Sequence, residues 1–303
     1  MNSLPSHSVP APQPIRRHDA RASLSGAWRG LWLFTWKPRL TWRALPGLLV
    51  TLLSIPLLTY FTIEPMQRMT NRESRHTEAQ ANTGQANAAD EGDLTATHAQ
   101  RPFYRWLINF YLLLALPLYC LTTCGPLIRD DLQSDTLVFL LTRPVSRART
   151  FWVKYACQMV WLETVVAVHA LLLYTAGVLR APGVGSTMAM FLGAQFLAVL
   201  AWGALSALLG VVTRRYLLLG IGYGFVVEVG IGHIPTNINS LSLTRHLQGL
   251  LGHHPMLADM YRWEPLNVLS SGGALLLGAA VFLTLGALLF TFREYHHATE
   301  MQR

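Results

Sequence analysis

The sequence contains few charged residues for its length. Of its 303 residues, 13% are charged and 51% are hydrophobic, whereas a soluble domain carries about 25% charged residues. The charge is also unevenly spread, because several long runs contain almost no acidic or basic side chain. These runs exclude an ordinary soluble fold and indicate whole segments that avoid water.

Cysteine is scarce as well, with three residues in the chain. Cys120, Cys124 and Cys157 lie in or beside apolar runs and none lies in an outer loop, which excludes a disulfide framework. Cys120 and Cys124 are one helical turn apart, a spacing that metal ligation can use. We favour the alternative, in which they pack between helices as small apolar residues.

Metal-ligand patterns are also missing from the histidines. His233, His246, His253 and His254 gather in one segment with Asp259 nearby, but they lack the defined spacing and neighbouring thiols of a metal site. We therefore expect surface histidines and no metal site.

Six apolar runs are long enough to cross a bilayer. A membrane helix needs about 20 consecutive apolar residues, and such runs occur at about 44–63, 104–128, 155–179, 187–213, 216–235 and 271–292. The sequence therefore predicts an all-α membrane protein with six transmembrane helices, forming a single domain over 25–303. We expect a disordered cytoplasmic tail at 1–24 and a flexible outer loop at 65–102, because neither has the residues of a core.

The basic residues predict the orientation of the chain. With the N-terminus inside, 16 of the 24 Lys and Arg residues fall on the inner side, as the positive-inside rule requires. Both termini are then cytoplasmic, and the net charge of +8 serves orientation and membrane lipids and not nucleic acid. Arg outnumbers Lys 22 to 2, a composition that favours a bacterial cytoplasmic (inner) membrane.

Two further segments have amphipathic patterns. Trp28, Trp32 and Trp36 recur every four residues, with basic residues between them, which predicts an interfacial helix anchored on the inner leaflet before the first span. Between 233 and 270 the pieces LTRHLQGLL and PMLADMYRW are too short to span. They predict short helices or re-entrant segments on the outer face.

The inner loop between the second and third runs contains an apolar stretch that cannot span. Residues 127–156 read LIRDDLQSDTLVFLLTRPVSRARTFWVKYA. Leu137, Leu140 and Leu141 follow the i, i+3, i+4 pattern behind acidic residues, and Pro144 ends it. This predicts a short amphipathic helix over 131–141, whose apolar face must be covered by lipid or by another protein.

The motif DDLQSDTLVFLLTRPVSR, followed by Lys154 at the start of a run, resembles the loop between spans two and three of type-2 export permeases of ATP-binding-cassette (ABC) transporters. The resemblance implies that the loop contains a coupling helix, which docks on a partner P-loop ATPase through an apolar centre and a polar rim. The residues it assigns to ATPase coupling are Asp130, Asp131, Thr136, Leu137, Leu140, Leu141, Arg143, Pro144 and Arg147.

ATP hydrolysis itself is not expected in this chain. A phosphate loop needs a Gly before its Lys, and Lys37 and Lys154 follow Trp and Val. ATP and Mg²⁺ would therefore be held by the partner, and this chain would bind no cofactor. Gly220 and Gly224 form a small-residue pair, which predicts contact with a second permease subunit in a homodimer or heterodimer.

Glu163 and Glu228 place acids inside predicted spans, where an ionised carboxylate needs a partner, water or a cavity. Each either lines a substrate route or is hydrogen-bonded between helices. A polytopic membrane enzyme and a membrane anchor that recruits a cytoplasmic partner are the rival classes, although G-x-S-x-G and H-E-x-x-H are missing. Our hypothesis is the transmembrane subunit of an ATP-driven exporter.

Overall fold

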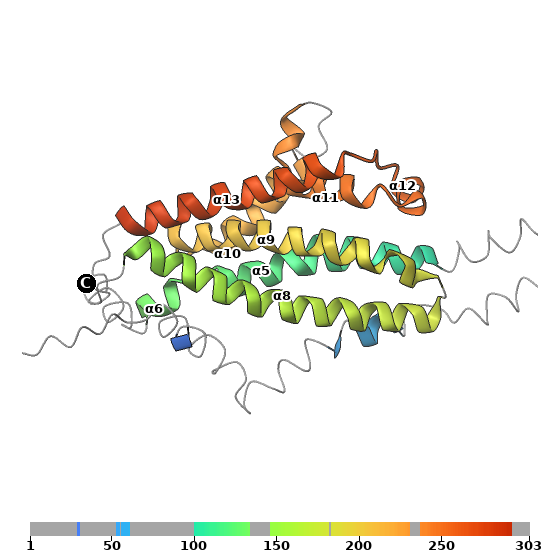
Figure 1. The fold of residues 1–303 in the computed structure, drawn as a ribbon, viewed down its shortest axis with the longest axis horizontal. Coiled ribbons are helices and arrows are strands. Elements are labelled where there is room, and N and C mark those ends of the chain that lie inside the picture. Colours follow the sequence, from blue (N-terminus) through green and yellow to red (C-terminus); the bar gives the residue numbers. More distant parts are fainter. Residues whose placement is uncertain are drawn as a thin grey trace, which may run out of the picture.

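The computed structural model describes residues 29–30, 53–54, 56–60, 100–133, 146–181, 183–230 and 237–292, and within them all regular structure is helical (Figure 1). In chain order the elements are η1 (Leu107–Ala115), α5 (Leu116–Cys124), α6 (Arg129–Gln133), α8 (Arg147–Arg180), η2 (Val184–Thr187), α9 (Met188–Val212), α10 (Tyr216–Tyr223), η3 (Gly224–Gly230), η5 (Asn237–Leu241), α11 (Leu243–Leu251), α12 (Pro255–Tyr261) and α13 (Val268–Phe292).

Four helical stretches are long and apolar enough to cross a membrane. They are Gln100–Asp131, Arg147–Arg180, Val184–Val212 and Val268–Phe292. These stretches confirm the runs predicted at 104–128, 155–179, 187–213 and 271–292. The chain is therefore a multi-pass helical membrane protein.

Two predicted spans stay predictions. Within 216–235, the described helix is Tyr216–Gly230, which is shorter than the four long ones. Most of 44–63 lies outside the described residues, although 53–54 and 56–60 are helical. The prediction of six spans therefore rests on the sequence alone.

Helix α9 is the central helix of the bundle. It packs against α5, α8, α10, α11 and α13. In the stretch Val184–Val212, which contains α9, 67% of the most apolar segment is buried, against 33% of the corresponding segment of α13. Helix α9 has an alanine at every third position from 198 to 207, and Ala198, Ala201, Ala204 and Ala207 are all nearly inaccessible. These short side chains let neighbouring helices approach closely.

The first long stretch is not a uniform α-helix. Residues of η1 are wound as a π-helix, and Pro117 follows in the first turn of α5. Proline lacks an N–H and clashes with the carbonyl four residues earlier, and wider π turns are one way to relieve that clash. Helix α5 ends at Cys124, directly before Gly125 and Pro126, and a turn leads into α6.

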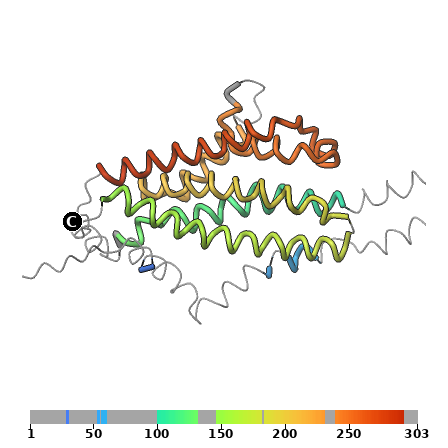
Figure 2. Tube along the Cα trace, in the orientation of Figure 1, coloured from blue at the N-terminus to red at the C-terminus, as the bar shows by residue number. Residues whose placement is uncertain are grey.

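The hairpin between α8 and α9 marks one end of the bundle. Its tight turn places Gly183 at φ 91°, and the Arg180 guanidinium lies 3.8 Å from the centre of the Tyr60 ring. Helices α11 and α12 coincide with the two amphipathic pieces predicted from the sequence, and α12 lies at this same end (Figures 1 and 2). At this end an exposed ion pair of 3.5 Å joins Arg101 to Asp259 of α12.

Several predictions fall outside the described residues. They are the tail at 1–24, the interfacial helix with Trp28, Trp32 and Trp36 apart from residues 29–30, the loop at 65–102 apart from its last three residues, and the segment from Ser134 to Val145 with Thr136, Leu137, Leu140, Leu141, Arg143 and Pro144.

Candidate functional site

Both ends of the charged loop are described, and they lie at the opposite end of the bundle from the hairpin (Figure 1). The loop leaves the helix bundle through α6 and returns to it through the first turns of α8. Side chains at these two ends attach the loop to the long helices through three contacts, which we call joints.

The first joint is a buried ion pair between Asp131 in α6 and Lys154 in α8. The two side chains are only 5% and 7% exposed, and Lys154 Nζ also donates a hydrogen bond to the Leu127 carbonyl at 3.2 Å. Charges inside membrane helices are expensive and pair with one another. Both Asp131 and Leu127 are thereby held against the start of α8.

The second joint is made by Arg129, whose Nε donates hydrogen bonds to the carbonyls of Gly210 at 3.1 Å and Thr213 at 2.9 Å. The last carbonyls of a helix have no partner within the helix, and its C-terminus attracts a cation. Arg129 therefore caps the C-terminal end of α9 and holds α6 against it.

The third joint lies at the other end of the loop. Arg147 Nη1 donates a hydrogen bond to the Thr291 carbonyl at 3.4 Å, in the last turn of α13. One turn later, the fully buried Phe151 ring lies 6.2 Å from that of Phe290. The loop is thus attached to α8, α9 and α13.

Glycines make the attachment to α9 tight. A Cβ added to Gly210 would overlap the Gly125 carbonyl oxygen, and one added to Gly125 would overlap the Tyr216 ring. The backbone of the turn after α5 therefore lies directly on α9, a contact that any side chain at Gly210 would prevent.

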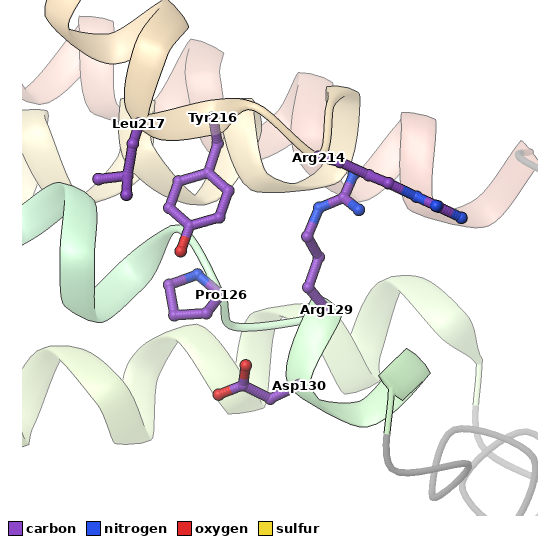
Figure 3. A pocket seen from close by; sticks show the side chains of 6 residues that line it. All are labelled: Pro126, Arg129, Asp130, Arg214, Tyr216 and Leu217. Atoms are coloured by element: carbon purple, nitrogen blue, oxygen red, sulfur yellow. The ribbon is translucent and has the colours of Figure 1, made fainter. Parts of the chain in front are cut away.

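An open pocket of about 320 Å³ lies beside these joints. Its lining residues are Pro126, Arg129, Asp130, Arg214, Tyr216 and Leu217 (Figure 3). Arg129 rises from α6 towards the turn that holds Arg214, and the Tyr216 hydroxyl points towards Pro126 (Figure 3). The pocket is therefore mixed in character, with two cations, one carboxylate, one hydroxyl and two apolar side chains.

Glu228 in η3 is 7% exposed and lies at the N-terminus of α11. Its carboxylate accepts hydrogen bonds from the Ser242 hydroxyl at 2.6 Å and from the backbone N–H groups of Leu243 at 3.1 Å and Thr244 at 2.8 Å. The first N–H groups of a helix need acceptors. Glu228 thus caps α11 from another element, and a part in a substrate route stays a prediction.

Glu163 in α8 has a different environment. Its Oε1 is buried without a hydrogen-bond partner among the described residues. It lies within electrostatic reach of Tyr111 and Cys120 on the first long stretch. Its proposed place on a substrate route also stays a prediction.

The sequence motif therefore divides in three. Asp131 and Arg147 contact the spans, Asp130 is exposed at the pocket, and the remaining assigned residues lie outside the described part. Sequence reasoning missed Arg129, Arg214 and Tyr216. Arg129 directly precedes the acidic pair of the motif, which was the one available signal.

The three cysteines are free and buried, as expected for residues that pack between helices. Among the described residues, no group of three or more His, Cys, Asp or Glu side chains could hold a metal ion.

The fold and the loop define a class, namely a multi-pass membrane protein with a charged inter-span loop fixed to three of its helices. Residues 89–231 match the family described as ABC-2 family transporter protein, and this range contains both ends of the loop. No curated protein matches the chain. Residues 89–231 are an ABC-2 family transporter membrane domain, the family that the loop motif indicated. Such domains are typically non-catalytic permeases, which generally pair with ATPase subunits.

Proposed function

We propose that this chain couples ATP hydrolysis by a separate P-loop ATPase subunit to outward transport across a bacterial cytoplasmic membrane. Both termini would be cytoplasmic, with ATP and Mg²⁺ bound by the ATPase. A second permease subunit, identical or different, would complete the transporter. The substrate would pass between the two permease subunits, along the second and fifth predicted spans.

The observation that supports this proposal is the attachment of the charged loop to the bundle. Asp131 binds Lys154 of α8, Arg129 binds the end of α9, and Arg147 binds the end of α13. A displacement of the loop would therefore move three spanning helices together. Closure of an ATPase dimer beneath the loop would shift these helices as a rigid body.

The first test is a pull-down of the tagged full chain from its native membrane in mild detergent. We expect a stoichiometric P-loop ATPase in the eluate of the wild type. In a variant with Leu137, Leu140 and Leu141 changed to Asp, the ATPase should be lost, because charges replace the apolar face that docks.

A matched control changes Thr95, Ala96 and Thr97 to Asp, which adds three acids to a different loop. This control should retain the ATPase, and both variants should stay in the membrane fraction after carbonate extraction. Recovery of the wild-type chain without an ATPase, or retention of the ATPase by the triple leucine variant, would contradict the proposal.

A further inference from the structure

Helix α8 contains an acid and an imidazole whose polar atoms are buried but not hydrogen-bonded. Glu163 lies at the middle of the helix, and His169 lies six residues later. Glu163 Oε1 and His169 Nε2 are both inaccessible and have no hydrogen-bond partner among the described residues. Buried polar side-chain atoms are nearly always hydrogen-bonded, so these two exceptions need an explanation.

Tyr111 of η1 lies against both positions. Its hydroxyl donates a hydrogen bond to the Val166 carbonyl at 3.2 Å, and Val166 is midway between Glu163 and His169 in the sequence. The Tyr111 ring meets the His169 ring edge-on, with 5.1 Å between the ring centroids, and it is within electrostatic reach of Glu163. Both groups therefore lie beside the same contact between α8 and η1.

The described helices that pack against α8 bring no Lys or Arg to Glu163. Helices α5, α9 and α13 and the short η2 pack against α8 and contain no Lys, Arg, Asp or Glu. The ionisable groups that surround Glu163 are weak acids, namely Tyr111, Tyr119, Cys120 and Cys124 from the first long stretch and Tyr155 from α8 itself. An ionised Glu163 would therefore have no counter-ion in the described part of the chain, which is costly inside a membrane.

A proton would remove this cost. A protonated carboxyl is neutral and needs no cation, and the His169 imidazole can hold a proton as well. One proton keeps the pair neutral overall on either residue, as the membrane interior favours. A proton also needs no cavity, unlike a metal ion or an organic cation.

We propose that Glu163 and His169 form a proton-binding site inside the membrane domain. Uptake of a proton from water forms an O–H bond on the Glu163 carboxylate or an N–H bond on the His169 imidazole, and release returns the proton to water. The hydrogen bond from Tyr111 to Val166 holds η1 beside the site, so a shift of η1 along α8 would open it to water. The site goes beyond the proposed transport function, and proton binding does not depend on that function.

The test is infrared difference spectroscopy of the purified full chain in dodecyl maltoside, a detergent without carbonyl groups, between neutral and alkaline pH. A protonated carboxyl has a C=O stretching band that a carboxylate lacks, and exposed Asp and Glu side chains are already ionised over this range. We expect the wild type to lose such a band as the pH rises. Glu163→Gln should abolish the band, whereas Glu163→Asp keeps a carboxyl and should retain one.

Glu228→Gln is the matched control, because Glu228 is the other acid within the predicted spans and already accepts three hydrogen bonds. It should leave the band unchanged. A band that persists in Glu163→Gln, or that disappears in Glu228→Gln, would overturn the proposal. The amide I band of the same spectra measures helix content and so distinguishes loss of the proton site from unfolding.

A second arm tests the share of His169. Without the imidazole the Glu163 carboxyl alone holds the proton, so His169→Gln should strengthen the carboxyl band at neutral pH. His253→Gln is the control, because the His253 ring lies beyond the end of α11 against the Gly249 carbonyl, and it should leave the band unchanged. Identical bands in the wild type and in His169→Gln would overturn the pairing of the two residues.

Discussion

Asp131 and Lys154 form an ion pair that is almost inaccessible to solvent, although both residues belong to a loop junction rich in charge. The pair joins the first turn of the loop to the spanning helix that follows it. The Asp131 carboxylate therefore binds a residue of its own chain, and it does not lie on the exposed rim of the loop. Any role in ATPase coupling would be exerted through the position that this contact gives to α6.

We predict that removing either partner of this pair destabilises the protein strongly. Asp131→Asn or Lys154→Met leaves a buried charge without compensation, which costs about 3–5 kcal/mol. The double variant should recover much of the loss, because no lone charge then remains. Thermal unfolding in detergent measures both effects. The exposed pair Arg101–Asp259 provides the control, since Asp259→Asn should cost no more than about 1 kcal/mol. Unchanged melting in both single variants would contradict the buried pair.

We predict that Gly210→Ala separates α9 from the turn after α5. The added methyl group would overlap the Gly125 carbonyl, and overpacking of this kind costs about 1–3 kcal/mol. Gly193→Ala is the matched control in the same helix, because nothing lies within 4 Å of its added Cβ. That control should be neutral or more stable, since Ala favours helices over Gly. Similar melting temperatures for the two variants would show that the close approach is wrong.

We predict that Glu228→Ala frays the start of α11. The variant removes the acceptor of three hydrogen bonds, and loss of a helix cap costs about 0.5–2 kcal/mol. Hydrogen exchange of residues 243–247 should accelerate, whereas Glu264→Ala, at an exposed acid, should leave it unchanged. If Glu228→Gln kept exchange at the wild-type rate but abolished transport, the carboxylate would have a role on the substrate route as well.

We predict that Arg129→Gln loosens the end of α9. The carbonyls of Gly210 and Thr213 lose the cation that binds them, and a hydrogen bond from a charged donor contributes about 1.5–3 kcal/mol. Exchange should accelerate over residues 208–213, while Arg215→Gln should leave this segment unchanged. A wild-type exchange rate in the Arg129 variant would contradict the hydrogen bonds from Arg129 to the end of α9.

The sequence predicted those features that depend on neighbouring residues. Apolar length marked four spans, and the amphipathic piece LTRHLQGLL gave α11 its bounds. The contacts between distant segments were not predictable in this way. The charge of Asp131 suggested an exposed rim, and only the return of α8 brings Lys154 to it. Glu228 likewise depends on α11 folding back against η3, which no local pattern contains.

The hydrogen bond from Arg147 to the Thr291 carbonyl brings the end of the last spanning helix to the charged loop. A fluorophore or spin label attached directly after Phe292 would therefore start beside that loop. Its signal would report the arrival of a partner protein without any change to the loop sequence. For the same reason, a bulky fusion at this point would compete with that partner for space.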